Sequence, residues 1–120
     1  MRRIALIGLT VIALVFLNGS VLVWAQQTAK VTGEVVDTYC FVTMGARGEG
    51  HRQCGLGCAH KGIPVGIVEN GTNKLYVLLP NKNDTSLSKD VINKMGRTAT
   101  VTGKVYANGG SQFLTVESVS

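Results

Sequence analysis

Hydrophobic positions downstream of residue 30 cluster in short segments that polar, turn-forming residues separate, a pattern typical of β-strands. The first such segment, residues 30–37, has Val31, Val35 and Val36 around a central glycine, as expected for a strand that bends. Four further segments follow at residues 65–69, 74–79, 97–106 and 112–119. Asn-Gly turn sequences join the second segment to the third and the fourth to the fifth, so we predict two hairpins and one additional strand.

The hydrophobic spacing changes between the third and fourth strands. Apolar residues recur there at helical intervals: Leu87, Val91, Ile92 and Met95. Ser86 stands where an N-cap is expected, and Gly96 stands where a helix commonly ends. The resulting order is that of the OB-fold, a five-stranded Greek-key barrel with its helix between strands 3 and 4. We therefore predict a mainly β, small OB-like barrel with one short helix.

A repeated pentapeptide supports this fold. VTGEV at residues 31–35 recurs as VTGKV at residues 101–105, which places a glycine at matching points of the first and fourth strands. Curved barrel strands use glycine in this way.

The first 25 residues have the pattern of an export signal. Two arginines precede an apolar run that ends in a small-residue cleavage site at Ala25. We expect a signal peptide over residues 1–25 and a mature OB-like domain over residues 26–120, periplasmic or secreted. The alternative is an anchor helix retained over residues 4–24, and only then would the protein contact the membrane.

Composition limits the classes of partner. Residues 26–120 contain 10 basic and 7 acidic side chains, which are scattered along the chain. Such a balance is typical of an ordinary solvated surface and argues against nucleic acid as a partner. A domain of this size has a modest core, so a disulfide or a metal can matter to its stability.

The candidate chemistry lies in the glycine-rich loop at residues 40–62, which contains all three cysteines and both histidines. His51, Cys54 and Cys58 stand at i, i+3 and i+7, so a helical turn would bring them onto one face. Three thiolates and one imidazole form a complete tetrahedral ligand set for zinc, and soft sulfur also suits copper(I). We therefore predict a zinc or copper site whose ligands are Cys40, His51, Cys54 and Cys58, with His60 as the alternative nitrogen ligand.

Two other interpretations of this loop stay open. A disulfide from Cys40 to Cys54 or Cys58 would brace the loop, and the odd thiol would be free, metal-bound or linked to a partner in the cell envelope. A thiol-dependent redox enzyme would need an activating histidine and an orienting carboxylate such as Glu49 or Asp37. However, the Cys54-x3-Cys58 spacing is neither the C-x-x-C motif of thiol oxidoreductases nor the C-x-x-C-H motif that attaches haem.

Three stretches of the mature domain carry a wider resemblance: VTGEVVDTYC, HRQCGLGCAHKGIPVGIV, and VTGKV with LTVESV. Together they resemble a group of small exported bacterial proteins with OB-like domains, whose first loop carries a Cys followed by H-x-x-C-x-x-x-C. The resemblance implies the fold and the compartment rather than an activity. It makes Cys40, His51, Cys54 and Cys58 the matching loop positions and leaves the role of His60 open.

The sequence thus favours an exported, non-enzymatic binding module with a Cys/His metal site. Such a module could serve in metal handling or as a small subunit of an envelope redox assembly. The alternative from another class is a structural and interaction domain that a disulfide braces and whose third thiol contacts a partner.

Overall fold

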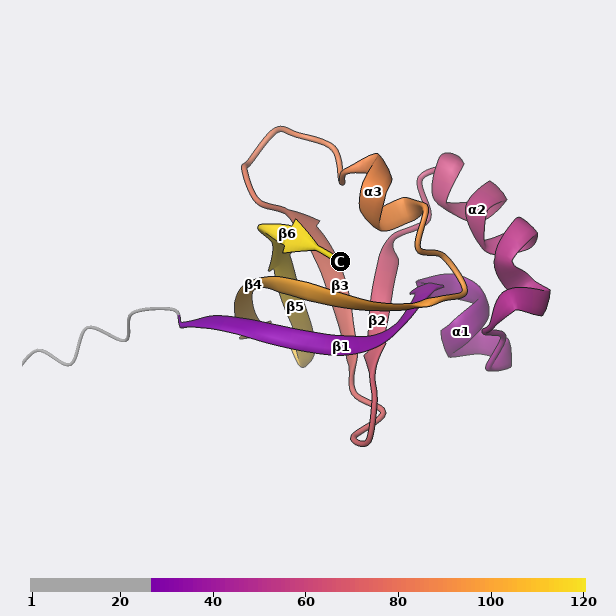
Figure 1. Ribbon diagram of the computed structural model, residues 1–120, viewed down its shortest axis with the longest axis horizontal. Helices are drawn as coiled ribbons and strands as arrows, with labels where there is room; N and C mark the ends of the chain where they lie inside the picture. Colours follow the sequence, from indigo (N-terminus) through magenta and orange to yellow (C-terminus); the bar gives the residue numbers. More distant parts are fainter. Residues whose placement is uncertain (1–26) are drawn as a thin grey trace, which may run out of the picture.

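Residues 27–120, which the computed structural model describes, form a closed five-stranded barrel (Figure 1). Its strands are β1 (Thr28–Asp37), β2 (Val65–Glu69), β3 (Leu75–Pro80), β4 (Thr98–Asn108) and β5 (Ser111–Val116). They neighbour one another in the order β1-β2-β3-β5-β4, and β4 pairs with β1 to close the barrel. Of these five pairings only β3–β5 is parallel. The predicted OB-like barrel is therefore confirmed, whereas the predicted signal or anchor segment lies outside the described residues.

The two glycines of the repeated pentapeptide lie where the long strands β1 and β4 coil around the barrel. At Gly33 the strand β1 passes from pairing with β4 to pairing with β2. A Cβ on Gly33 would lie 2.0 Å from the carbonyl oxygen of Val68, and a Cβ on Gly103 would lie 1.5 Å from that of Thr115. Only glycine allows the backbones to approach so closely, which gives the repeat a structural cause.

The last predicted strand divides in two. The segment expected at residues 112–119 forms β5, bends at Glu117 and continues as the two-residue strand β6 (Ser118–Val119). This strand pairs with β4 at Val101 and Thr102.

The predicted helix between β3 and β4 is present but short. It is α3 (Lys89–Ile92), and its N-cap is Ser88, whose hydroxyl accepts from the Val91 N–H, so the prediction of Ser86 was wrong. The turns that follow it end at Gly96, which has a φ of +72°. Val91 and Met95 are buried and carry this segment into the barrel core.

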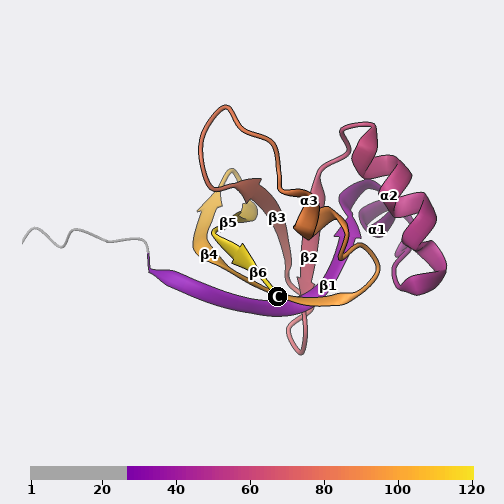
Figure 2. The same ribbon diagram turned by 45° about the horizontal axis from the view of Figure 1, so that its top comes forward.

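The long loop expected between the first two strands is mostly helical. It contains α1 (Thr38–Met44), the single 3₁₀ turn η1 (Glu49–His51) and α2 (Arg52–His60). In both views α1 and α2 lie together at one end of the barrel, beyond the end of β1 (Figures 1 and 2). Within residues 27–120 no helix is both long enough and apolar enough to span a bilayer.

Candidate metal centre

Cys40 owes its position to the junction between β1 and α1. Asp37 ends β1 and caps α1, because its Oδ1 accepts from the backbone N–H of Cys40 at 2.8 Å. The helix ends at Gly45, whose φ of +66° suits glycine. Cys40 is the buried residue of this helix, so its thiol lies on the inner side rather than in solvent.

His51 stands on a turn that several contacts fix to the barrel. Glu34 of β1 accepts from Arg47 Nε at 2.9 Å and also from the backbone N–H of Gly48. On the other side of the turn, Arg97 Nε donates to Glu49 at 2.7 Å. These contacts tie the turn to β1 and to the residue before β4 (Thr98–Asn108), and His51 Nε2 lies 2.8 Å from the second carboxylate oxygen of Asp37.

Cys54 and Cys58 stand one helical turn apart on α2. Arg52 ties the start of this helix to the segment after α3, since it donates to the carbonyl oxygens of Asn93 and Met95 at 2.8 and 2.6 Å. Farther along α2, Leu56 and Ala59 pack against the barrel core. The opposite face of the helix is thereby left for the two thiols.

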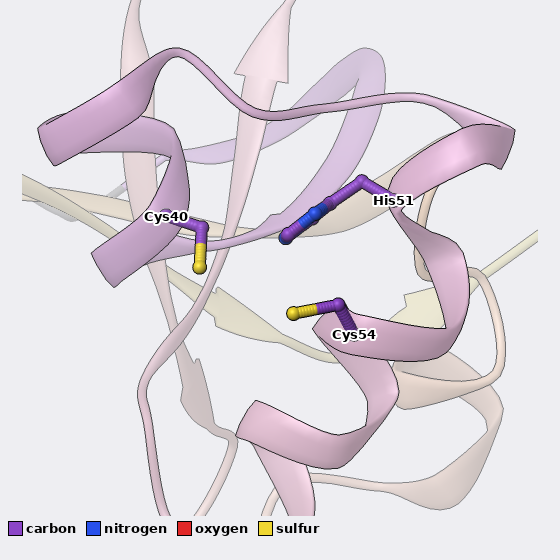
Figure 3. Close-up of side chains that lie close together, drawn as sticks. All are labelled: Cys40, His51 and Cys54. Carbon is purple, nitrogen blue, oxygen red and sulfur yellow. The ribbon is translucent and has the colours of Figure 1, made fainter.

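The three elements bring their side chains together (Figure 3). Ligand atoms of Cys40, His51 and Cys54 all lie within 4.8 Å of one another, and their tips converge from α1 on one side and from η1 and α2 on the other. Cys58 belongs to a second group of the same compactness, with Asp37 and Cys40. The two groups share Cys40, so the four residues predicted as ligands form one cluster that could hold a metal ion.

The structure does not bring His60 into this cluster. His60 is exposed at the end of α2, and neither group of ligand atoms includes it. The three cysteines of the described chain are all free thiols, so the structure contains no support for the predicted disulfide. Cys40 is buried, Cys58 is half-buried and Cys54 is exposed.

Burial and the nearby Asp37 carboxylate raise the pKa values of two thiols of the cluster, Cys40 and Cys58. Burial raises the pKa of the Cys40 thiol to about 12, and the hydrogen bond and negative charge of Asp37 add to this effect. The pKa of Cys58 is raised mainly by burial and then by the charge of Asp37. Burial alone would also raise the pKa of Asp37, but its hydrogen bonds with the Cys40 backbone, His51 and the Cys40 thiol outweigh burial and lower it. At neutral pH the metal-free cluster therefore combines an ionised carboxylate with protonated Cys40 and Cys58 thiols.

Asp37 is the residue whose importance the sequence conceals. The sequence suggested Asp37 only as one of two possible orienting carboxylates for a thiol-dependent enzyme. In the structure Asp37 is fully buried and is hydrogen-bonded to both Cys40 and His51. The available signal was its position directly before Thr38-Tyr39-Cys40, where an aspartate can cap a helix. That signal depended on recognising α1.

Comparison with known proteins identified no matching family model, curated protein or solved structure. Conclusions about function consequently depend on the geometry of the Cys/His cluster itself.

Proposed function

We propose that this protein is an exported, non-enzymatic OB-like module that binds one thiophilic metal ion, zinc(II) or copper(I), through Cys40, His51, Cys54 and Cys58. In this proposal it works outside the cytoplasm, in metal handling or as a small subunit of an envelope redox assembly. An envelope protein would be its partner in either role.

The observation that carries the proposal is the convergence of two thiols and an imidazole from three separate elements. Cys40 of α1, His51 of η1 and Cys54 of α2 place their ligand atoms within 4.8 Å of one another. A tetrahedral metal ion lies about 2.3 Å from thiolate sulfur and about 2.0 Å from imidazole nitrogen, so its ligand atoms must lie within a few ångströms of one another. Cys58, one turn beyond Cys54, is the natural fourth ligand, because a cysteine side chain can reach the shared centre by a rotamer change.

The donor set favours soft or borderline ions. Thiolate sulfur and imidazole nitrogen suit zinc and copper(I), whereas calcium and magnesium prefer oxygen ligands. Because the pKa values of Cys40 and Cys58 are raised, an ion that binds both sulfurs must displace their protons, so zinc affinity should increase with pH.

Metal analysis of the protein purified from its native compartment tests the proposal. We expect about one equivalent of zinc or copper and, in the reduced protein, three free thiols once the metal is removed. Cys40→Ser and Cys54→Ser should each weaken zinc binding by at least about tenfold in competition with a chromophoric chelator. The matched control is His60→Asn, which changes the exposed histidine of the same helix and should leave zinc affinity unchanged.

Two results would overturn the proposal. One is a protein that, after mild reduction and addition of zinc or copper(I), still binds neither ion. The other is a stable disulfide between two of the cysteines in the native protein, which would favour the disulfide-braced interaction domain instead. Recovery of a defined envelope protein in a pull-down, lost in Cys54→Ser, would connect the metal site to a partner.

A further inference from the structure

The buried carboxylate of Asp37 touches two of the proposed ligands in different ways. Its Oδ1 accepts from the backbone N–H of Cys40 at 2.8 Å, and its Oδ2 lies 2.8 Å from His51 Nε2. Asp37 itself has no exposed surface. One side chain thus connects the ligand on α1 with the ligand on η1, and both oxygens are engaged.

From this geometry we infer that Asp37 is the positioning residue of the metal site: it accepts a hydrogen bond from the Nε2–H of His51 and so leaves Nδ1 as the metal-binding atom. This inference rests on the proposed function and specifies how the same site selects its nitrogen ligand.

For the neutral imidazole that a metal ligand requires, the chemistry of the two groups leaves one arrangement. An ionised carboxylate has only acceptor sites, so the hydrogen between Asp37 Oδ2 and His51 Nε2 belongs to the histidine. In a neutral imidazole with its proton on Nε2, the free lone pair is on Nδ1. That lone pair is the one available to an ion held with Cys40 and Cys54. Metal-bound histidines commonly donate their other ring N–H to a carboxylate in this manner, which fixes the orientation of the ring.

The surroundings of Asp37 keep this arrangement rigid. The capping bond to Cys40 fixes one carboxylate oxygen, so the other oxygen has a defined direction toward His51. Asp37 has no exposed surface, and α2 lies close to its second oxygen, since a Cβ added to Gly55 would be 3.4 Å from Asp37 Oδ2, an ordinary van der Waals contact. Because both carboxylate oxygens are hydrogen-bonded within the buried site, His51 has a defined partner and ring orientation before a metal arrives.

The Asp37→Asn substitution tests the role of the carboxylate with almost no change in shape. The amide oxygen of asparagine can still accept from the Cys40 N–H, so α1 keeps its cap, but the amide NH₂ would then face His51 Nε2. To accept from this NH₂, His51 must carry its proton on Nδ1, which blocks the proposed ligand atom. We expect zinc affinity to fall about 10- to 100-fold.

A double-variant comparison separates positioning from general structural damage. In a His51→Ala background the tautomer no longer matters, so adding Asp37→Asn should change the remaining zinc affinity by less than about twofold. An equal loss of affinity in both backgrounds would overturn the inference, because Asp37 would then act independently of His51.

Nitrogen NMR of the wild-type protein provides a test that does not depend on a variant folding. The chain contains two histidines, so ¹⁵N-histidine labelling gives two ring systems, with exposed His60 as the internal reference. We expect the Nε2–H tautomer of His51 in the metal-free protein and a metal-induced shift at Nδ1 on addition of zinc. A shift at Nε2 would overturn the inference and leave the proposed metal site intact. Failure of the wild-type protein to bind any metal would instead overturn the proposed function, while the metal-free spectrum would still report the tautomer.

Discussion

Gly55 of α2 lies so close to Met95 that an added Cβ would fall 2.8 Å from both the Cγ and the Sδ of the methionine. Gly57 lies two residues farther along the same helix, and a Cβ added to it would meet nothing within 4 Å. The two glycines therefore have different roles. Gly55 allows α2 to lie on the barrel end and on Asp37, whereas Gly57 only lowers the helical propensity of α2.

This difference predicts opposite effects of the same substitution. Gly57→Ala should raise the free energy of unfolding by about 0.5 to 1 kcal/mol, the usual difference between alanine and glycine in a helix. Gly55→Ala should lower it by about 1 to 3 kcal/mol, because buried Met95 must move. If zinc binds as proposed, the same variant should also have a lower zinc affinity, since α2 carries Cys54. Urea unfolding of the metal-free protein measures both changes in the free energy of unfolding. Equal stability of the two variants would contradict the close approach of Gly55 to Met95.

The bend glycines of the barrel predict a more severe loss. Gly33→Ala and Gly103→Ala would each place a methyl group against a backbone carbonyl that cannot rotate away. We expect each substitution to lower the free energy of unfolding by about 3 kcal/mol or more, or to prevent folding. Gly50→Ala is the control, because nothing lies within 4 Å of its added Cβ and its φ is not positive. Thermal unfolding followed by circular dichroism distinguishes the three, and native-like melting of Gly103→Ala would refute the proposed role of the repeat.

The barrel was predictable from the sequence because its signals are local. Each strand has its own apolar, β-branched segment, and the turn residues between them define the hairpins. At the second hairpin, Gly109 and Gly110 both have positive φ, as the Asn-Gly-Gly sequence suggests. The strand order then followed from the position of one helical segment among five strands.

The two helices that carry the Cys/His cluster were not predictable in the same way. Helix α1 leaves large apolar side chains exposed, at Tyr39, Val42 and Met44, and so has no apolar face to recognise. In α2 the two glycines lower the helical propensity of the sequence. The helix is stabilised instead by contacts with residues far away in the sequence, such as the hydrogen bonds of Arg52 to the chain after α3. The i, i+3 and i+7 spacing nevertheless predicted that His51, Cys54 and Cys58 lie near one another, since it is a local property of the helix. The hydrogen bond between Asp37 and His51 accompanies tertiary contacts of Glu34 and Arg97 with the turn before α2, and the residue spacing alone does not predict such contacts.

The cap of α3 predicts a small, measurable difference between two neighbouring serines. The Ser88 hydroxyl accepts from the Val91 N–H at 3.4 Å, a long capping bond, while Ser86 lies outside the helix. Ser88→Ala should therefore lower the free energy of unfolding by about 0.5 to 1 kcal/mol. Ser86→Ala should change it by less than about 0.5 kcal/mol, as is usual for surface positions. Chemical unfolding under identical conditions compares them, and a larger loss for Ser86→Ala would restore Ser86 as the cap.

The raised pKa of Cys40 predicts that the metal-free protein loses stability in alkaline solution. In the folded protein the Cys40 pKa is about 12, compared with an ordinary thiol value near 9. An acid whose pKa rises on folding favours the folded state while it is protonated, so its contribution is complete below pH 9 and declines as the pH rises toward 12. Cys58 and Tyr76, whose pKa values are raised mainly by burial, contribute in the same direction.

Cys40→Ala isolates the contribution of this thiol. Under reducing, metal-free conditions the variant should show a shallower fall in unfolding free energy between pH 9 and pH 11 than the wild type, although the fall persists because Cys58 and Tyr76 remain. Zinc should reverse the dependence in the wild type, because an ion that takes the place of the thiol protons binds more tightly as the pH rises. Urea unfolding at a series of pH values, with and without zinc, measures both slopes. Identical slopes for the variant and the wild type in the absence of metal would show that the Cys40 thiol ionises as readily in the folded protein as in the unfolded chain.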